Sequence, residues 1–369
     1  MLMAVALLVV PCTLAVNVVR FLWYAFRNRL NLRYYLLCAV VKAAMSAFTI
    51  RQIQHLTPPT DEVYKAWIRR KRGLTKEPAL KQRLRCDIQP LPEGNASILW
   101  VGDRRKARKA VLFLHGGGYV MPSQAGHFEC VWNAYILSGL ETGTEVAVAF
   151  LHYPLAPAWK PPAQLRQAAS ALAEMLDAGF GAEDIVVGGD SAGGNLALQL
   201  LHHIVDPHPE ACRITLREPL AAVFLVSPWV GCDFSGPSFD EHGGSDMLSR
   251  STMSSIEAQN RVRGKESSSS SSSTSDDRGG WADPLEGRGA WLSRLDGAAR
   301  KILITVGERE VLADQGRLLA KTIVALQTGV EVTLESDPKA AHDFFVLEGM
   351  LGEVGEAMIR MKRWFKSLL

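Results

Sequence analysis

Residues 185–195 read IVVGGDSAGGN and carry the strongest structural signal in this chain of 369 residues. The apolar run Ile185–Gly188 is typical of a buried parallel strand, and good helix formers follow the motif. Between them, the pattern G-x-S-x-G places Ser191 on a tight strand-to-helix turn with its Oγ exposed. Gly189 and Gly193 allow that turn and a close approach of helix to strand. This context favours a nucleophilic serine over an incidental serine in a glycine-rich turn.

A second glycine-rich string, HGGGY at residues 115–119, follows the apolar run Val111–Leu114. Consecutive glycines let the main chain aim its N–H groups into a cavity, where a side chain would block a substrate carbonyl. Such N–H groups can hold an oxyanion beside the serine. We expect His115 to brace this loop by hydrogen bonding, because the catalytic base of this architecture comes from nearer the chain end.

The end of the chain supplies an acid and a base in the required order. A predicted buried strand that ends in glycine precedes three acidic residues, Glu308, Glu310 and Asp314. A second predicted strand, with alternating apolar residues, precedes His342. A serine hydroxyl needs a histidine to remove its proton, and that histidine needs an acid to fix its tautomer. The order Ser191, acid, His342 therefore predicts a catalytic triad.

As a set, these motifs resemble those of the hormone-sensitive-lipase-like group of α/β-hydrolases. This group includes arylacetamide deacetylases, fungal steryl acetyl hydrolases and many microbial carboxylesterases. The resemblance implies an α/β-hydrolase fold, in which helices flank a mostly parallel central sheet and a helical cap covers the site. The shared motifs span roughly residues 108–369 and are HGGGY, GDSAGG, YPLAP at 153–157, SPW at 227–229, GEREVLAD at 307–314 and HDF at 342–344.

The resemblance also implies roles for individual residues. The nucleophile falls on Ser191 and the base on His342. The acid falls on Glu310, where many relatives have aspartate, with Asp314 and Glu308 as rivals. Relatives often have glycine where this chain has Asp343. The oxyanion donors fall on the N–H groups of Gly117, Gly118 and Ala192. The supporting motif residues are His115, Gly116, Gly189, Asp190 and Gly193.

These residues predict a serine hydrolase that works through an acyl-enzyme. The resemblance, together with the expected membrane anchor, implies a carboxylesterase or deacetylase that hydrolyses short-acyl esters of hydrophobic alcohols, acetyl esters above all. No metal and no organic cofactor is expected. An arylacetamide-type amidase and a secondary-metabolite acyl hydrolase or transferase are alternatives within the enzyme class. A non-catalytic α/β-hydrolase that binds a hydrophobic ligand is the alternative from another class. The presence of both His342 and Glu310 favours an enzyme, because binding proteins on this scaffold can lose the base.

Composition and length predict one catalytic domain with an appendage. The net charge of +3 gives little support to nucleic-acid binding. The six cysteines have no C-x-x-C spacing, and both their pairing and the oligomeric state are left open. The expected domains are residues 1–50, a membrane anchor and interfacial segment, 51–107, a linker and cap, and 108–369, the catalytic domain.

Residues 232–282 are expected to form a cap insertion within the catalytic domain. Residues 247–258 form a predicted cap helix, whose apolar residues would line a pocket or fill the core of the cap. These are Met247, Leu248, Met253 and Ile256. The unbroken serine run at residues 267–273 has no apolar residue to bury and predicts a disordered loop.

The N-terminus predicts contact with membrane lipid. Met1–Val19 contains no charged residue and is long enough for a membrane span. Arginines and aromatic residues alternate over residues 20–33, as in an interfacial segment. The next apolar stretch, Tyr34–Ile50, is broken only by Lys42 and fits a short second span, an interfacial helix or a cap helix.

The two indicators of orientation disagree. The arginines favour the cytosolic side for residues 20–33, whereas Asn95 begins a glycosylation sequon, which is used only in the lumen. A hairpin with spans at 1–19 and 34–50 would satisfy both indicators. The resemblance to arylacetamide deacetylases implies a membrane-anchored enzyme of the endoplasmic reticulum, with the luminal side favoured.

Overall fold

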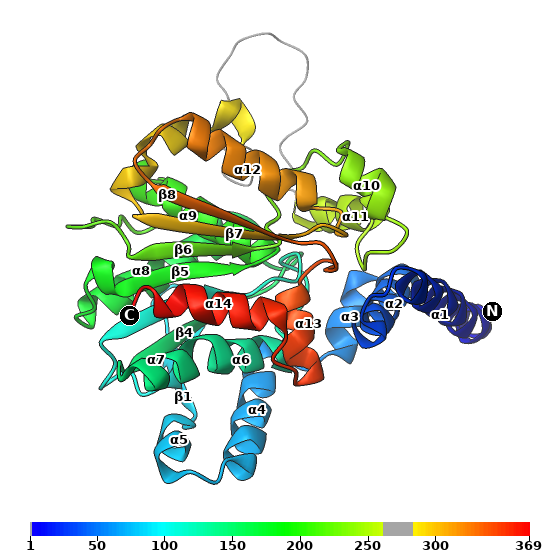
Figure 1. Cartoon of the computed structure of the whole chain (residues 1–369), viewed down its shortest axis with the longest axis horizontal. Coiled ribbons are helices and arrows are strands. Elements are labelled where there is room, and N and C mark those ends of the chain that lie inside the picture. Colours follow the sequence, from blue (N-terminus) through cyan, green and yellow to red (C-terminus); the bar gives the residue numbers. More distant parts are fainter. Residues whose placement is uncertain (1, 261–282) are drawn as a thin grey trace.

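Eight strands form one sheet in the computed structural model, which describes residues 2–260 and 283–369. Their order is β1-β2-β4-β3-β5-β6-β7-β8 (Figure 1). Strand β2 runs antiparallel to both of its neighbours, and every pair from β4 to β8 is parallel. The predicted, mostly parallel sheet is therefore confirmed. The strands are β1 (Asp87–Pro90), β2 (Ser97–Gly102), β3 (Lys109–Leu114), β4 (Val146–His152), β5 (Ile185–Asp190), β6 (Ala222–Val226), β7 (Lys301–Gly307) and β8 (Glu331–Asp337).

Side chains of the central strands are buried on both faces of the sheet. In β3, Leu112 and Leu114 belong to one apolar core, and Val111 and Phe113 belong to the other. This alternation follows from the two-residue period of a strand. Because both faces are covered, the central strands are apolar at nearly every position rather than at every second one.

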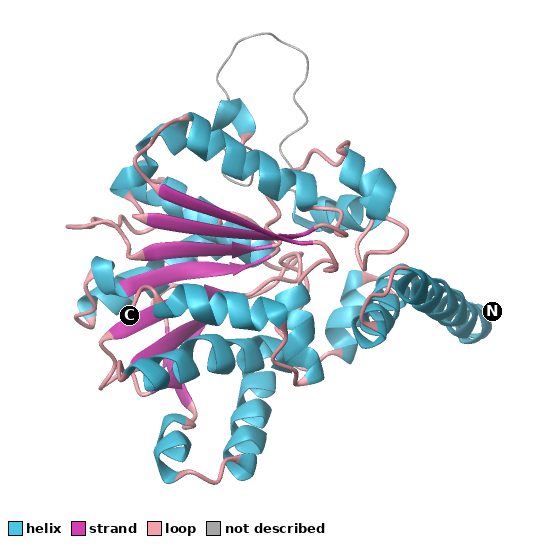
Figure 2. Cartoon of the chain, in the orientation of Figure 1, coloured by secondary structure: helices cyan, strands magenta, loops and turns pink. Residues whose placement is uncertain are grey.

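Helices form a layer on each face (Figure 2). One layer contains α8 (Ala163–Asp177), α9 (Ala192–Val205) and α12 (Ala313–Ala325). The other contains α6 (Ala125–Val131), the π-helical turn η1 (Trp132–Ile136), α7 (Leu137–Thr142) and α14 (Glu356–Lys366). The described residues also form α4 (Thr60–Leu74), α5 (Pro78–Arg83), α13 (Phe344–Leu351) and the 3-10 segments η2 (Ala182–Asp184) and η3 (Glu286–Gly297).

Helices from two distant parts of the chain form a cap beyond the carboxyl ends of the parallel strands (Figure 1). The N-terminal part supplies α1 (Leu2–Arg27), α2 (Leu32–Ala47) and α3 (Ile50–Leu56). The segment between β6 and β7 supplies α10 (Pro237–His242) and α11 (Arg250–Asn260). Ligands of open α/β sheets bind at this end of the strands, so the cap lies where a substrate has to enter.

The membrane span predicted over Met1–Val19 is not supported. Within residues 2–260 and 283–369, no helix is both long enough and apolar enough to cross a membrane. Helix α1 continues past Val19 through Arg20 to Arg27, and it buries Phe21 and Ala25 in the protein core.

The second apolar stretch, Tyr34–Ile50, is a cap helix rather than a span. Helix α2 covers most of it and buries Tyr35 and Cys38 in the core. The ammonium group of Lys42 lies inside the protein and donates hydrogen bonds to three carbonyl oxygens, those of Gly243 (2.9 Å), Asp246 (2.8 Å) and Leu248 (2.9 Å). The residue that interrupts the apolar pattern is therefore the one that fastens this helix to the segment between β6 and β7.

The predicted boundary between a linker and cap (51–107) and a catalytic domain (108–369) does not match the sheet. Strands β1 and β2 belong to the sheet, although they precede residue 108. Helix α4 from the same region packs on the catalytic domain, because Trp67 is buried and donates its indole N–H to Glu129 Oε1 at 3.0 Å. Arg70 and Lys71 pair with the same carboxylate. The serine run at 267–273 lies outside the described residues.

Candidate active site

Ser191 occupies a strained turn between β5 and α9. Its backbone has a φ of 50° and a ψ of −115°, conformations that cost energy in a non-glycine residue. The turn packs tightly against β3, because a Cβ atom on Gly189 or Gly193 would collide with the carbonyl oxygen of Leu114. These two glycines are therefore required by the close contact of α9 with the sheet, as the sequence predicts.

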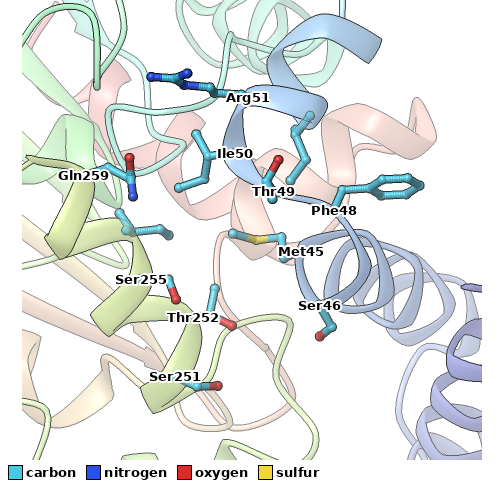
Figure 3. A pocket seen from close by; sticks show the side chains of 12 residues that line it. Met45, Ser46, Phe48, Thr49, Ile50, Arg51, Ser251, Thr252, Ser255 and Gln259 are labelled. Carbon is cyan, nitrogen blue, oxygen red and sulfur yellow. The ribbon is translucent and has the colours of Figure 1, made fainter. Parts of the chain in front are cut away.

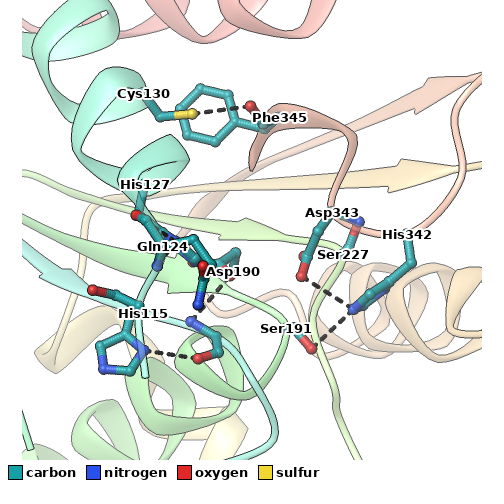
Figure 4. Close-up of polar contacts among 12 residues, drawn as sticks. His115, Gln124, His127, Cys130, Asp190, Ser191, Ser227, His342, Asp343 and Phe345 are labelled. Atoms are coloured by element: carbon teal, nitrogen blue, oxygen red, sulfur yellow. Dashed lines mark hydrogen bonds and ion pairs between the residues drawn. The ribbon is translucent and has the colours of Figure 1, made fainter. Parts of the chain in front are cut away.

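The imidazole of His342 faces this serine. His342 lies in the loop between β8 and α13, and its Nε2 is 3.0 Å from Ser191 Oγ (Figure 4). Both side chains are buried. The backbone N–H of His342 contacts Asp246 Oδ1 at 3.3 Å, which fixes the loop that carries the imidazole. This geometry lets Nε2 take the hydroxyl proton of Ser191.

Of the three candidate acids, the structure brings Glu310 to the histidine. Glu310 Oε2 lies 3.4 Å from His342 Nδ1, and the Glu310 side chain is fully buried. Asp314 instead accepts a hydrogen bond from the backbone of Ser238. Glu308 is half-exposed and pairs with Arg317. The contact with Glu310 is longer than a strong hydrogen bond, and catalytic hydrogen bonds often tighten only when substrate binds.

A further carboxylate reaches the opposite side of the imidazole. Asp343 Oδ2 lies 3.3 Å from His342 Nε2, the nitrogen that faces Ser191 (Figure 4). Asp343 has a φ of 53°, in the left-handed region that glycine adopts without strain. Asp343 departs from the family pattern, and the sequence alone predicts no role for it.

The charges around His342 favour its protonated form. Burial by itself lowers the pKa of an imidazole, but the carboxylates of Asp343, Glu310 and Asp246 outweigh burial and raise the pKa of His342 to about 10. Burial also raises the pKa of Asp343 to about 8, although His342 opposes this shift. The pKa of Glu310 is raised by burial and lowered in part by His342.

The glycine loop after β3 lies beside the serine. Gly117 has a φ of 100° and Gly118 a φ of 64°, and both line the cavity that contains Ser191. The N–H of Gly116 donates to Asp190 Oδ2 at 3.0 Å, and a Cβ atom on Gly116 would collide with this carboxylate. Asp190 thereby ties the loop to the strand that ends at the nucleophile. Ala192, the third expected oxyanion donor, is the first residue of α9.

His115 lies inside this loop as a neutral group. Its ring stacks on Tyr153 with a centroid distance of 4.2 Å, and its Nδ1 lies 2.8 Å from the carbonyl oxygen of Gly116. Tyr153 also donates its hydroxyl to the carbonyl oxygen of His115 at 2.7 Å. Burial lowers the pKa of His115 to about 3, so this imidazole carries no charge at neutral pH.

A cavity of about 40 Å³ lies over Ser191 and His342. Its polar lining consists of these two residues, the glycine loop and Asp343, and its remaining lining is apolar. The four apolar residues expected from the cap all take part. The apolar lining residues are Val41, Met45, Met121, Trp229, Met247, Leu248, Met253 and Ile256.

Two residues that support the site carry no motif in the sequence. Asp246 accepts from the backbone N–H of Val311 at 2.8 Å, in addition to its contact with His342, so it holds both the acid loop and the base loop. Asn260 donates from Nδ2 to the carbonyl oxygen of Gly118 at 2.9 Å and so fastens α11 to the glycine loop. Both contacts join segments far apart in the chain, which local spacing does not reveal.

Comparison with known proteins agrees with the fold. The family model described as the alpha/beta hydrolase fold matches residues 111–346. An acetyl-hydrolase from Streptomyces hygroscopicus is 29% identical over 250 residues, which are 68% of this chain and 72% of that protein. An ethyl acetate hydrolase from Pseudomonas putida is 29% identical over 262 residues, which are 70% of this chain and 72% of that protein.

Solved structures show the same fold at lower identity. An esterase from the bacterial hormone-sensitive lipase family superposes with a TM-score of 0.57 and 24% identity, covering 85% of this chain and 99% of that chain. An esterase crystal soaked with p-nitrophenyl butyrate gives a TM-score of 0.61 and 24% identity, covering 91% of this chain and 98% of that one.

The chain belongs to the α/β hydrolase fold family, because the family model matches more than half of its length. Within that family, its sequence relatives mark it as a carboxylic ester hydrolase.

Proposed function

We propose that this protein is a serine carboxylesterase or deacetylase that hydrolyses short-acyl esters, above all acetates, of hydrophobic alcohols. One observation carries the proposal. Ser191 Oγ lies 3.0 Å from His342 Nε2, and both groups open into a small cavity with apolar walls. The names of the two relatives from Streptomyces hygroscopicus and Pseudomonas putida support the choice of acetate.

In the proposed mechanism, His342 Nε2 removes the hydroxyl proton while Ser191 Oγ bonds to the acyl carbon. The resulting oxyanion accepts hydrogen bonds from the N–H groups of Gly117, Gly118 and Ala192, where losing one donor costs about 100- to 1000-fold in rate. His342 then gives its proton to the leaving alkoxide oxygen, which releases the alcohol and leaves an acyl-enzyme. Water repeats the cycle and releases the carboxylic acid. The carboxylate of Glu310 stabilises the imidazolium ion throughout.

The size of the cavity supports a short acyl group. Its volume of about 40 Å³ has room for a few atoms only, since a cavity needs about 10–15 Å³ of such space to hold one water molecule. Methionines and isoleucine from the cap close the space above Ser191. A long acyl chain has no room there unless the cap moves.

The test is hydrolysis of p-nitrophenyl esters from acetate to palmitate by the wild-type protein and by the Ser191→Ala variant. We expect turnover that requires Ser191 and falls off above butyrate. Ser191-dependent turnover that peaks on long chains would contradict the short-acyl specificity and keep the serine mechanism. Equal rates for the two proteins would refute the catalytic assignment and favour the ligand-binding alternative.

The amidase alternative is tested with the same two proteins. An acetylated aromatic amine replaces the ester, and release of the free amine is measured. We expect a kcat/KM well below that for p-nitrophenyl acetate, since an amine leaves less readily than a phenol. Preference for the amide would favour the arylacetamide-type amidase.

Location at the endoplasmic reticulum and glycosylation of Asn95 stay predictions. The exposed position of Asn95, in the turn between β1 and β2, is compatible with an attached glycan. A shift in electrophoretic mobility on glycosidase treatment, lost in Asn95→Gln, tests glycosylation and places the catalytic domain in the lumen. Absence of the shift favours the cytosolic orientation.

A further inference from the structure

A large cleft adjoins the catalytic cavity and lies between the two parts of the cap. Its volume is about 740 Å³, within the range of pockets that hold drug-sized ligands. Residues from the end of α2 and from α3 form one side, and residues of α11 form the other (Figure 3). The catalytic mechanism described above uses none of this space.

The cleft and the catalytic cavity share two lining residues, Met45 and Ile256. Ile256 packs on the glycine loop so closely that a Cβ atom on Gly118 would lie 2.7 Å from its Cγ2. The cleft therefore ends beside the oxyanion loop. An ester with its acyl group at Ser191 has to place its alcohol part somewhere next to this cavity, and the cleft is the adjoining space.

The two walls of the cleft differ in chemistry. The wall from α2 and α3 carries the apolar residues Met45, Phe48, Ile50 and Ile53, together with Ser46, Thr49 and Arg51. On α11, residues 252, 255 and 259 recur at helical spacing, so a row of hydroxyl and amide groups faces Met45 and Ile50 across the cleft (Figure 3). The adjoining face of α11 is buried through Met253 and Ile256, and Ile256 also lines the cleft.

This row supplies hydrogen-bond partners without charge. Each serine or threonine hydroxyl can donate and accept, and the amide of Gln259 can do both. Arg51 at the rim contributes the cleft's charged side chain. A purely hydrocarbon alcohol in this cleft would cover these polar groups without satisfying them, which costs free energy. A charged alcohol would find a single partner, and it would lose its hydration against Met45 and Ile50.

From these observations we infer that the cleft is the alcohol subsite, and that the preferred substrates are acetates of bulky alcohols that are apolar on one side and carry hydroxyl or carbonyl oxygens on the other. The apolar side lies against Met45 and Ile50, and the oxygens bond to Thr252, Ser255 and Gln259. This subsite rests on the proposed function, since only an ester with its acyl group at Ser191 places an alcohol here.

The test compares two rigid esters of one skeleton, 2-adamantyl acetate and its dihydroxy derivative with both hydroxyls on the side remote from the ester. We expect the wild-type protein to have the lower KM for the dihydroxy ester. In Ser255→Ala and Gln259→Leu, KM for that ester rises about three- to tenfold for each hydrogen bond lost, while KM for the parent ester does not rise. Ser254→Ala is the matched control, because Ser254 lies on the same helix outside the cleft lining.

Turnover of p-nitrophenyl acetate is measured in every variant and is expected to stay at the wild-type rate, because this ester is too small to fill the cleft. Equal KM values for the two adamantyl esters, or a rise for both esters in Ser255→Ala, would overturn the subsite. Binding of the two free alcohols to Ser191→Ala, measured by calorimetry, gives the same comparison without turnover. Loss of p-nitrophenyl acetate hydrolysis tests the esterase function, whereas the comparison of the two adamantyl alcohols tests the alcohol subsite alone.

Discussion

Asp343 is expected to keep the catalytic histidine protonated to a higher pH than an ordinary histidine side chain. Its Oδ2 lies 3.3 Å from the Nε2 of His342, the nitrogen that must be free to accept the Ser191 proton. Glu310 faces the other ring nitrogen, and Asp246 contacts the backbone of His342. The ion pair of Asp190 with His127 acts on the charge of Asp343. Asp343→Asn removes one negative charge from this set. Asparagine also tolerates the left-handed backbone at this position.

The size of the effect follows from this distance. Two unit charges 3.3 Å apart interact with about 5 kcal/mol at an effective dielectric constant of about 20, which corresponds to an upper limit of about 3.7 pKa units. The charge on Asp343 is only partly present near neutral pH, because the pKa of Asp343 is itself raised to about 8. We therefore expect Asp343→Asn to lower the pKa of His342 by about one to three units, the range observed for a neighbouring opposite charge.

The sign of the activity change follows from the role of the base. A raised pKa keeps the proton on His342 to higher pH, so the reactive neutral imidazole dominates only above that pKa. Lowering the pKa moves the acid limb of the kcat/KM profile to lower pH, and kcat/KM at pH 7 rises at least about tenfold. The assay is the pH dependence of ethyl acetate hydrolysis in a pH-stat, with Asp314→Asn as the control. An acid limb that stays in place, or moves to higher pH, would refute this reasoning.

Three further substitutions test other parts of the site. Glu310→Gln should lower kcat at least about a hundredfold, because the imidazolium ion loses its buried partner, whereas Asp314→Asn should leave kcat nearly unchanged in the same steady-state assay. Gly118→Ala should lower kcat about ten- to a hundredfold while the circular dichroism spectrum stays native, since its Cβ would lie 2.7 Å from Ile256 and its φ is 64°. A wild-type kcat in this variant would contradict a tight oxyanion loop. Lys42→Met should lower the free energy of unfolding by about 2 to 4 kcal/mol in urea titrations, because three carbonyl oxygens lose their hydrogen-bond donor. Unchanged stability would mean that water replaces the ammonium group.

The parallel half of the sheet and the nucleophile could be predicted because their signals are local. A strand, a glycine turn and a helix formed by consecutive residues leave a pattern such as that around Ser191, and the backbone requirement for glycine at 189 and 193 is visible in the sequence itself. His342 followed from chain order, and the family resemblance selected Glu310 among the three acids that chain order allowed. The contacts that bring these two residues to Ser191 join distant segments, so residue spacing in the sequence does not predict them.

The parts that were missed depend on contacts between distant segments. Strands β1 and β2 precede the family motifs and pair antiparallel, so neither the motifs nor an alternation of strand and helix indicated them. Asp246 lies in a polar stretch with no motif, and its role appears only when residues 311 and 342 come together. The apolar N-terminal residues satisfied the composition rule for membrane spans, and composition does not distinguish a lipid-facing helix from one packed on protein.

Lys42 shows that α2 packs on protein, and it links the cap to the chemistry. A lysine within an apolar helix is costly to bury unless its three donors are satisfied, and here the carbonyls of Gly243, Asp246 and Leu248 satisfy them. Its partners lie in the segment whose carboxylate, Asp246, holds the backbones of Val311 and His342. Helix α2 therefore supports the acid and the base through a single loop. Truncation before α3 should consequently impair hydrolysis of even the smallest ester, and an effect confined to bulky esters would show that this helix shapes only the alcohol subsite.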